Sequence, residues 1–304
     1  MALKNSSLIG SLRTRHLAFG AGTGAVLCWG IAAALVKGVN LDGLSLAFYR
    51  MWLGAAMTLL LLYMRGGSLT YKGVLASVPG GLALACDCSL FFLSVKMTTI
   101  SNAAVIGSLI PVPILLVGPF MFRERVTLHD LGLVAAALAG VIFVVFGSSG
   151  TPNWSPTGDL LAVGSMIAWA AYFIASKWAR RNMGALEYLA TVMLLSAIAI
   201  TPAALIFDTD LSINSGDVIL GIVLLSIVPS LGHLLMQWAH AYLELWVAAT
   251  LASTMPVVAA VVALVAFGEP IVSWQAVGML LVVVTVAKIA VRTGQMEIRF
   301  PARP

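Results

Sequence analysis

Charged residues are scarce in this chain. Only 10% of its 304 residues are Asp, Glu, Lys or Arg, whereas soluble domains carry roughly 25%. Apolar residues make up 61% of the sequence, and the mean hydropathy is +1.02. A single soluble core cannot bury that much apolar surface, so lipid has to act as the solvent for most of the chain.

Cysteine is also rare, and its placement excludes two further classes. Cys28, Cys86 and Cys88 all fall inside apolar runs, where a thiol behaves as a small buried hydrophobe. Three cysteines at these spacings form neither a disulfide framework nor a zinc site. We expect no metal and no cofactor.

The apolar runs also show no convincing pair of nucleophile and general base and no cluster of metal ligands. Ser108, in the segment IGSLIP, has no convincing general-base partner, and His233 is too isolated to indicate a zinc site. An intramembrane enzyme therefore lacks its usual signals. A channel stays open as an alternative, which steady conductance rather than saturable flux would identify.

The chain is rich in apolar runs of about 20 residues, the length that a helix needs to cross roughly 30 Å of hydrocarbon. We predict an all-α membrane protein with ten transmembrane helices. The predicted spans are 18–37, 44–64, 73–97, 100–122, 128–147, 158–179, 186–207, 216–242, 246–267 and 273–291.

The basic residues are distributed unevenly between the two sides of these spans. With the N-terminus inside, all seventeen Lys and Arg residues except Lys37, Arg50 and Lys96 fall on the cytoplasmic side. The positive-inside rule therefore predicts that both termini are cytoplasmic. The net charge of +5 reflects this topology, and we expect no nucleic-acid partner.

Two pairs of segments indicate an internal duplication. PVPILLVGPFMFRER (111–125) matches PVVAAVVALVAFGEP (256–270), and GAVLCWGIAAALVK (24–37) matches GSMIAWAAYFIASK (164–177). We predict two halves, 1–150 and 151–304, joined by the polar linker SSGTPNWSPTGD. Five helices per half is an odd number, so the second half would cross the membrane in the opposite sense. Such inverted repeats around a central cavity are typical of alternating-access transporters.

At these residues the chain resembles the drug/metabolite transporter superfamily, specifically its ten-helix members with two EamA-type repeats. The resemblance rests on Trp29 with Lys37, on Trp169 with Lys177, and on a mid-membrane Pro followed by a Gly-Glu-Arg-like end in each fourth helix. Arg123 departs from that pattern, since glycine is usual there. The segment IAWAAYFIASKWARR (167–181) is similar to the sixth helix of aromatic amino acid exporters. The resemblance implies amino acid export. Because one chain contains both repeats, we expect the protein to function as a monomer.

The eighth predicted helix carries a stripe of polar residues. They recur at spacings of three and four and therefore share one helix face, which has to avoid lipid. The stripe consists of Ser226, Ser230, His233, Gln237, His240 and Glu244. We expect it to line the cavity; the alternative is hydrogen bonding that holds neighbouring helices together.

Other candidates lie on the second, third and sixth helices. Asp87 is the acidic residue well inside a span, where it would bind a substrate ammonium or carry a coupling proton. The alternative is a structural pair with Arg50, Lys37 or a neighbouring helix. Arg50 would bind a substrate carboxylate, although bracing of a helix is the simpler role. Trp169 and Tyr172 would form a pocket for an aromatic side chain or would simply pack in the core.

Four prolines near helix centres are expected to bend their helices, because proline removes a backbone hydrogen bond. Bent helices suit a hinge or gate, and the repeat-matched pair is favoured for that role. These residues are Pro111, Pro113, Pro229 and Pro256.

We therefore predict a bacterial inner-membrane exporter of amino acids, with the substrate contacting Asp87, His233, Gln237, Trp169 and Tyr172. Ser108 and Ser230 complete the expected cavity lining. Export of another small metabolite or a drug is the alternative within the same superfamily. Proton antiport and facilitated diffusion remain equally open.

Overall fold

The computed structural model describes residues 2–35, 39–98, 100–148, 155–207, 209, 211–213, 215–268 and 270–295, and all regular structure in these ranges is α-helical. A helix satisfies its backbone polar groups internally, as a lipid-embedded chain requires. The helices are α1 (Ala2–Leu35), α2 (Gly43–Met64), α3 (Tyr71–Met97), α4 (Ile100–Ser108), α5 (Pro111–Phe122), α6 (Leu128–Ser148), α7 (Pro156–Ala179), α8 (Ala185–Ile206), α9 (Gly216–Ala239), α10 (Leu245–Ser253), α11 (Met255–Phe267) and α12 (Ser273–Gln295).

Nine segments within the described ranges are long and apolar enough to cross a membrane. The first predicted span, 18–37, lies in α1, which begins well before that span, at Ala2. Lys37, Glu269 and residues 149–154 of the predicted linker lie outside the described residues. The tenth span and the inversion of the halves stay predictions.

The predicted spans 100–122 and 246–267 are both found as candidate membrane spans, but each consists of two helices and is not one continuous helix. The first break separates α4 from α5 just before Pro111, and the second separates α10 from α11 next to Pro256. Proline cannot donate the backbone hydrogen bond that would continue the preceding turn. Pro113 lies in the first turn of α5, and α9 continues without interruption through Pro229.

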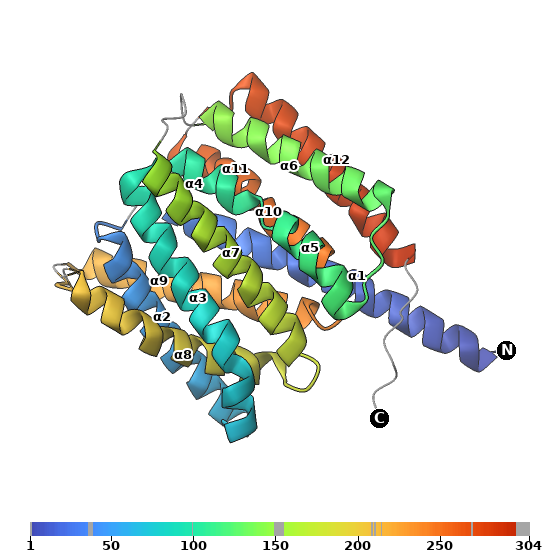
Figure 1. Ribbon diagram of the computed structural model, residues 1–304, viewed down its shortest axis with the longest axis horizontal. Helices are drawn as coiled ribbons and strands as arrows, with labels where there is room; N and C mark the ends of the chain where they lie inside the picture. The colour runs from blue at the N-terminus through green and yellow to red at the C-terminus, as the bar shows by residue number, and fades with distance from the viewer. Residues whose placement is uncertain are drawn as a thin grey trace.

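Helices of the first half pack against helices of the second half in a reciprocal pattern. α1 contacts α9 and α3 contacts α7, while α2 pairs with α8 and α6 with α12. Figure 1 shows α6 and α12 along one edge of the bundle and α2 and α8 at the opposite edge. Each helix pair thus joins the two halves of the sequence.

Corresponding positions of the two halves also share helix-end chemistry. The hydroxyl of Thr70 caps α3 by accepting from the N–H of Gly73, and Ser215 caps α9 in the same way through Val218. Thr70 and Ser215 are separated by 145 positions, the offset of the longer sequence match. The sequence comparison had not used these caps.

The helices α5 and α11 end in the same left-handed backbone conformation. Arg123 ends α5 with φ 54°, and Gly268 ends α11 with φ 67°. Glycine adopts this conformation readily, whereas a side chain crowds the backbone there. Arg123 therefore occupies a position that favours glycine, and an arginine there is expected to lower the stability of the fold.

The pair α6 and α12 meets at two glycines. A Cβ atom placed on Gly140 would lie 2.7 Å from Val282 Cγ2, and one placed on Gly278 would lie 2.5 Å from the carbonyl oxygen of Gly140. Small residues allow helix backbones to approach closely in lipid, where packing replaces the hydrophobic effect as the driving force. This backbone contact therefore needs glycine on both helices.

Replacing Arg123 with glycine is expected to stabilise the protein by about 1 kcal/mol, because the left-handed conformation at this position would no longer carry a side chain. The apparent melting temperature in detergent measures the change. Arg125→Gly is the control, since Arg125 has no positive φ. Equal or lower stability of Arg123→Gly would contradict the expectation.

Gly140→Val is expected to lower stability by about 1–3 kcal/mol, because overpacking forces neighbouring backbone apart. Gly132→Val on the same helix is the matched control, since nothing lies within 4 Å of a Cβ added there. The same melting assay compares the two variants. Similar losses in both would mean that helix propensity, not the α6–α12 contact, sets the effect.

Candidate functional site

A chain of hydrogen-bonded polar side chains joins α7 to α9. Tyr172 and Ser176 come from α7, and His233, Gln237 and His240 come from α9. All five are buried, with exposed fractions of 0–1%. The four-residue spacing on α7 and the similar spacing on α9 set the two rows of polar groups against each other.

The available donors and acceptors give this chain a direction. The amide of Gln237 donates to the Tyr172 hydroxyl at 2.6 Å, which leaves that hydroxyl to donate to His233 Nδ1 at 3.1 Å. The Ser176 hydroxyl donates to the side-chain oxygen Oε1 of Gln237 and accepts from Nδ1 of His240, with Oγ and Nδ1 2.7 Å apart. His240 Nε2 is buried and has no hydrogen-bond partner among the described residues.

Aromatic rings surround one end of this chain. The rings of Trp29 and Trp169 meet edge to face at 5.3 Å between centroids, and both approach His233, at 5.2 and 5.8 Å. Trp169 also stacks on Tyr172 at 5.3 Å. The buried indole N–H of Trp29 has no acceptor among the described residues. Trp29 and Trp169 occupy the same position in the two matched sequence segments, so corresponding residues of the two repeats are in contact here.

An acidic and a basic residue lie on α3 and α2 near this cluster. Asp87 is partly buried and accepts a hydrogen bond from Ser165 of α7 at 2.6 Å. Arg50 is partly buried, and its Nη2 lies 3.9 Å from the Cys88 sulfur. Arg50 was expected to brace a helix. Among the described residues, its hydrogen-bond acceptor is a thiol, which accepts only weakly.

A second group of polar contacts joins the halves where α7 and α9 end. The Lys177 ammonium lies 2.5 Å from Glu124 Oε1 and also donates to the Leu243 carbonyl at 2.5 Å. Glu124 Oε1 accepts from the N–H of Leu245 at 2.7 Å and thereby caps α10. We call Glu124, Lys177, Leu243 and Leu245 the latch.

Two further ion pairs lie at this end of the bundle. Arg15 of α1 meets Glu244 at 2.6 Å, and Arg292 of α12 meets Asp130 of α6. Arg180 Nε donates to the backbone carbonyl oxygen of Gln237 at 2.8 Å. The basic residues collected by the topology prediction therefore also fasten helices of both halves together.

The remaining predicted site residues lie outside these clusters. Ser108 donates to the Ala104 carbonyl within its own helix, and Ser230 is buried opposite Gly54 of α2. Pro111 and Pro256 stand at the two helix breaks. Contact of any of these residues with a substrate stays a prediction.

The sequence analysis had assigned no role to Trp29, Glu124 or Lys177 beyond marking the repeat. A signal for them existed, because Lys177 follows an apolar run and an ammonium near a membrane span needs a partner. The matched positions of Trp29 and Trp169 could likewise have suggested a meeting of the repeats. The partner of each residue, however, lies in the other half of the chain.

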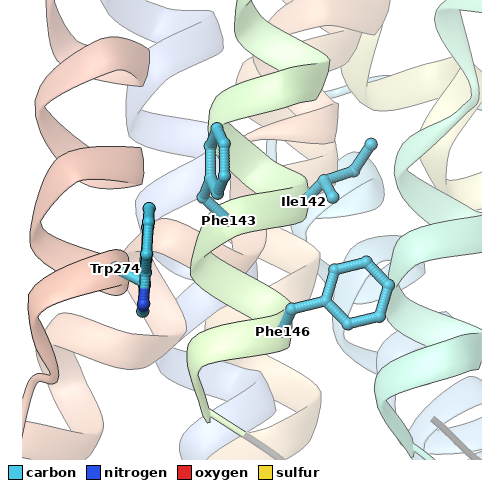
Figure 2. A pocket seen from close by; sticks show the side chains of 4 residues that line it. All are labelled: Ile142, Phe143, Phe146 and Trp274. Carbon is cyan, nitrogen blue, oxygen red and sulfur yellow. The ribbon is translucent and has the colours of Figure 1, made fainter. Parts of the chain in front are cut away.

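An apolar pocket of about 290 Å³ is lined by three side chains of α6 and one of α12. Figure 2 shows these side chains, which are Ile142, Phe143 and Phe146 of α6 and Trp274 of α12. The rings of Phe143 and Trp274 are stacked, with their centroids 6.0 Å apart. Binding sites for polar metabolites need convergent polar groups, and none of these four side chains supplies one except the Trp274 indole N–H. We therefore centre the candidate site on α1, α7 and α9.

Metal chemistry has no evident ligand set here. Within the part of the chain that the structure describes, no three His, Cys, Asp or Glu side chains are grouped to hold a metal ion. The arrangement instead combines aromatic surfaces with oriented hydrogen-bonding groups. Such a combination can bind an organic molecule that has an apolar part and a polar part.

Comparison with known proteins now gives the family. No curated protein matches the sequence. A solved structure, described as "Crystal structure of protein", matches with a TM-score of 0.79 and 20% identity, covering 92% of this chain and 99% of that one. That likeness shows the fold alone. Residues 17–146 and 156–291 both match the EamA-like transporter family. This membrane protein of many apolar helices therefore belongs to the EamA-like transporter family.

Proposed function

We propose that this transporter exports amino acids, aromatic and neutral ones in particular, across the bacterial inner membrane by alternating access. The observation that carries the proposal is the contact of Trp29 with Trp169 beside the polar chain of α7 and α9. Matched residues that touch each other are expected near the axis relating two repeats, where transporters of this kind bind substrate.

The aromatic rings and the polar chain suit different parts of one substrate. An aromatic amino acid side chain would stack against Trp29, Trp169 and Tyr172, since offset and edge-to-face contacts favour such pairs. Asp87 would accept its ammonium group, and His233 and Gln237 would complete the polar lining. The protein would act as a monomer without a cofactor, because one chain contains both repeats.

The latch supports the second part of the proposal. It joins the segments after α5 and α7 to the start of α10, and such contacts between the halves would hold one end of the bundle closed. The excess of Lys and Arg at that end supports a cytoplasmic location for it and for both termini. Inverted repeats 1–150 and 151–304 would open this end when the halves exchange conformations.

Counterflow in proteoliposomes tests the substrate class. Vesicles loaded with unlabelled tryptophan, methionine or threonine should take up the labelled amino acid saturably, and a pH gradient added in parallel tests for proton coupling. Sealed vesicles that contain folded protein and take up none of the three would overturn amino acid export. Metabolites and drugs would then be the next substrates to test.

Tyr172→Phe is expected to lower kcat/KM for tryptophan about tenfold, because Gln237 and His233 would each lose a buried hydrogen-bond partner. Tyr63→Phe is the matched control, since Tyr63 is 55% exposed. The counterflow assay measures both variants. Unchanged transport by Tyr172→Phe would remove the polar chain from the substrate site.

Lys177→Met is expected to open the latch end, because loss of one member of a buried ion pair costs about 3–5 kcal/mol. A cysteine at buried Ala239, in protein lacking the native cysteines, reports the opening. Its labelling by an impermeant maleimide from the cytoplasmic side of inside-out vesicles should accelerate at least about tenfold.

Two further variants control this experiment. Lys288→Met removes an exposed basic residue and should leave the labelling rate unchanged. The double variant Lys177→Met, Glu124→Gln removes both charges and should label faster than the parent while remaining folded. Equal labelling of parent and latch variants would contradict the gating role, and labelling from the opposite side only would reverse the proposed orientation.

A further inference from the structure

Arg50 is an unusual basic residue in this bundle. It lies seven residues after the start of α2, within the apolar segment Gly43–Met64, which places it about 10 Å along the helix. A guanidinium group at such a depth needs a counter-ion or a water-filled cavity. Arg15, Lys177 and Arg292 each contact a carboxylate.

Arg50 has no such partner among the described residues. Its hydrogen-bond contact is the Cys88 sulfur at 3.9 Å. Sulfur accepts hydrogen bonds weakly, and a guanidinium carries five N–H donors arranged to bind a carboxylate in two-pronged fashion. The side chain is only partly buried. Its donors are therefore available to an anion that the described residues do not supply.

Asp87 has the complementary charge and a similar lack of an ionic partner. Its Oδ1 accepts from Ser165, and no basic group of the described residues lies within ion-pair distance of it. Arg50 contacts Cys88, the residue next to Asp87, yet Arg50 and Asp87 form no ion pair. An acid and a base thus share one region while remaining apart.

Contacts with α7 bring this pair to the aromatic and polar cluster described above. Asp87 accepts from Ser165, which lies one helical turn before Trp169 on α7, and Arg50 contacts Cys88, the residue next to Asp87. Trp169 in turn packs against Trp29. The charged pair therefore lies near the surfaces on which an aromatic side chain would stack.

We infer that Arg50 and Asp87 form a binding site for the zwitterionic backbone of an amino acid, in which Arg50 binds the carboxylate and Asp87 the ammonium group. This inference rests on the proposed function and names the groups that select its substrate class. An amino acid zwitterion carries its ammonium and carboxylate groups on the same carbon, so it would neutralise both side chains at once. An amine or a carboxylic acid alone would leave one of them without a counter-ion.

A binding matrix on purified protein tests this assignment. The ligands are tryptophan, tryptamine, which lacks the carboxylate, and indole-3-propionate, which lacks the ammonium. Isothermal titration calorimetry measures each Kd. The wild type should prefer tryptophan over both analogues by about 10- to 100-fold, because each missing group forfeits a charge-assisted hydrogen bond.

The variants separate binding from bracing. Arg50→Gln should weaken tryptophan binding to the level of tryptamine and leave tryptamine itself unchanged. Asp87→Asn should weaken tryptophan binding to the level of indole-3-propionate and leave that ligand unchanged. Arg65→Gln, which removes the basic residue just after the end of α2, is the matched control and should change nothing.

Arg50→Lys keeps the charge and serves where Arg50→Gln does not fold. It should weaken the binding of tryptophan and of indole-3-propionate, which both carry a carboxylate, and leave tryptamine unchanged, since a lysine cannot reproduce two-pronged carboxylate binding. Equal loss of all three ligands in the Arg50 variants would identify a bracing residue and overturn the inference.

The wild-type measurements distinguish the two proposals. Tryptophan binding with an unchanged preference in both Arg50 and Asp87 variants would overturn the zwitterion site and leave amino acid export intact. Absence of binding by tryptophan, methionine and threonine to the wild type would overturn both. A wild type that binds tryptamine as tightly as tryptophan would overturn the role of Arg50 alone.

Discussion

The buried ion pair of Lys177 with Glu124 joins the two halves of the chain at one end of the bundle. An ammonium group at the end of an apolar helix cannot be left without a counter-ion, because desolvation of an unpaired charge costs several kcal/mol. Glu124 meets this need and at the same time accepts from Leu245, where the broken helix pair α10 and α11 begins. One carboxylate thus links the end of α5, the end of α7 and the start of α10.

The same physical constraint arranges the interior. Polar side chains of α7 and α9 cannot face lipid, so they satisfy one another in a directional chain that runs from His240 to His233. The aromatic rings beside them come from corresponding positions in the two sequence repeats. A site formed in this way takes equivalent parts from each half, which suits a protein whose halves are proposed to exchange conformations.

Much of the helical architecture could be predicted from the sequence, because span length and apolar composition are local properties. The ends of α3, α8 and α12 agree with the predicted spans within a few residues. The breaks at Pro111 and Pro256 were foreseen as bends only, since the sequence does not tell how far a helix recovers after a proline. The left-handed conformation of Arg123 could not be predicted, because the residue type argues against it.

The candidate site was less predictable for a different reason. The polar stripe of α9 was visible as a periodicity within one helix, whereas the partners of Lys177 and Trp29 lie more than fifty residues away in the sequence. Arg50 shows the same limit. In the sequence, the position of Arg50 near a helix end suggests that it braces that helix. Only the contacts in the structure show that it has no carboxylate partner among the described residues.

The glycine contact between α6 and α12 has a mechanical consequence. With each backbone seated against the other at Gly140 and Gly278, a Cβ on either residue would collide with the facing helix. Phe143 and Val282 already border the two glycines, so sliding of one helix along the other would press these larger residues against the facing backbone. Relative movement of the two halves would therefore have to turn about this contact, which makes the α6–α12 edge a pivot and places the largest displacements at the opposite edge, where α2 and α8 lie.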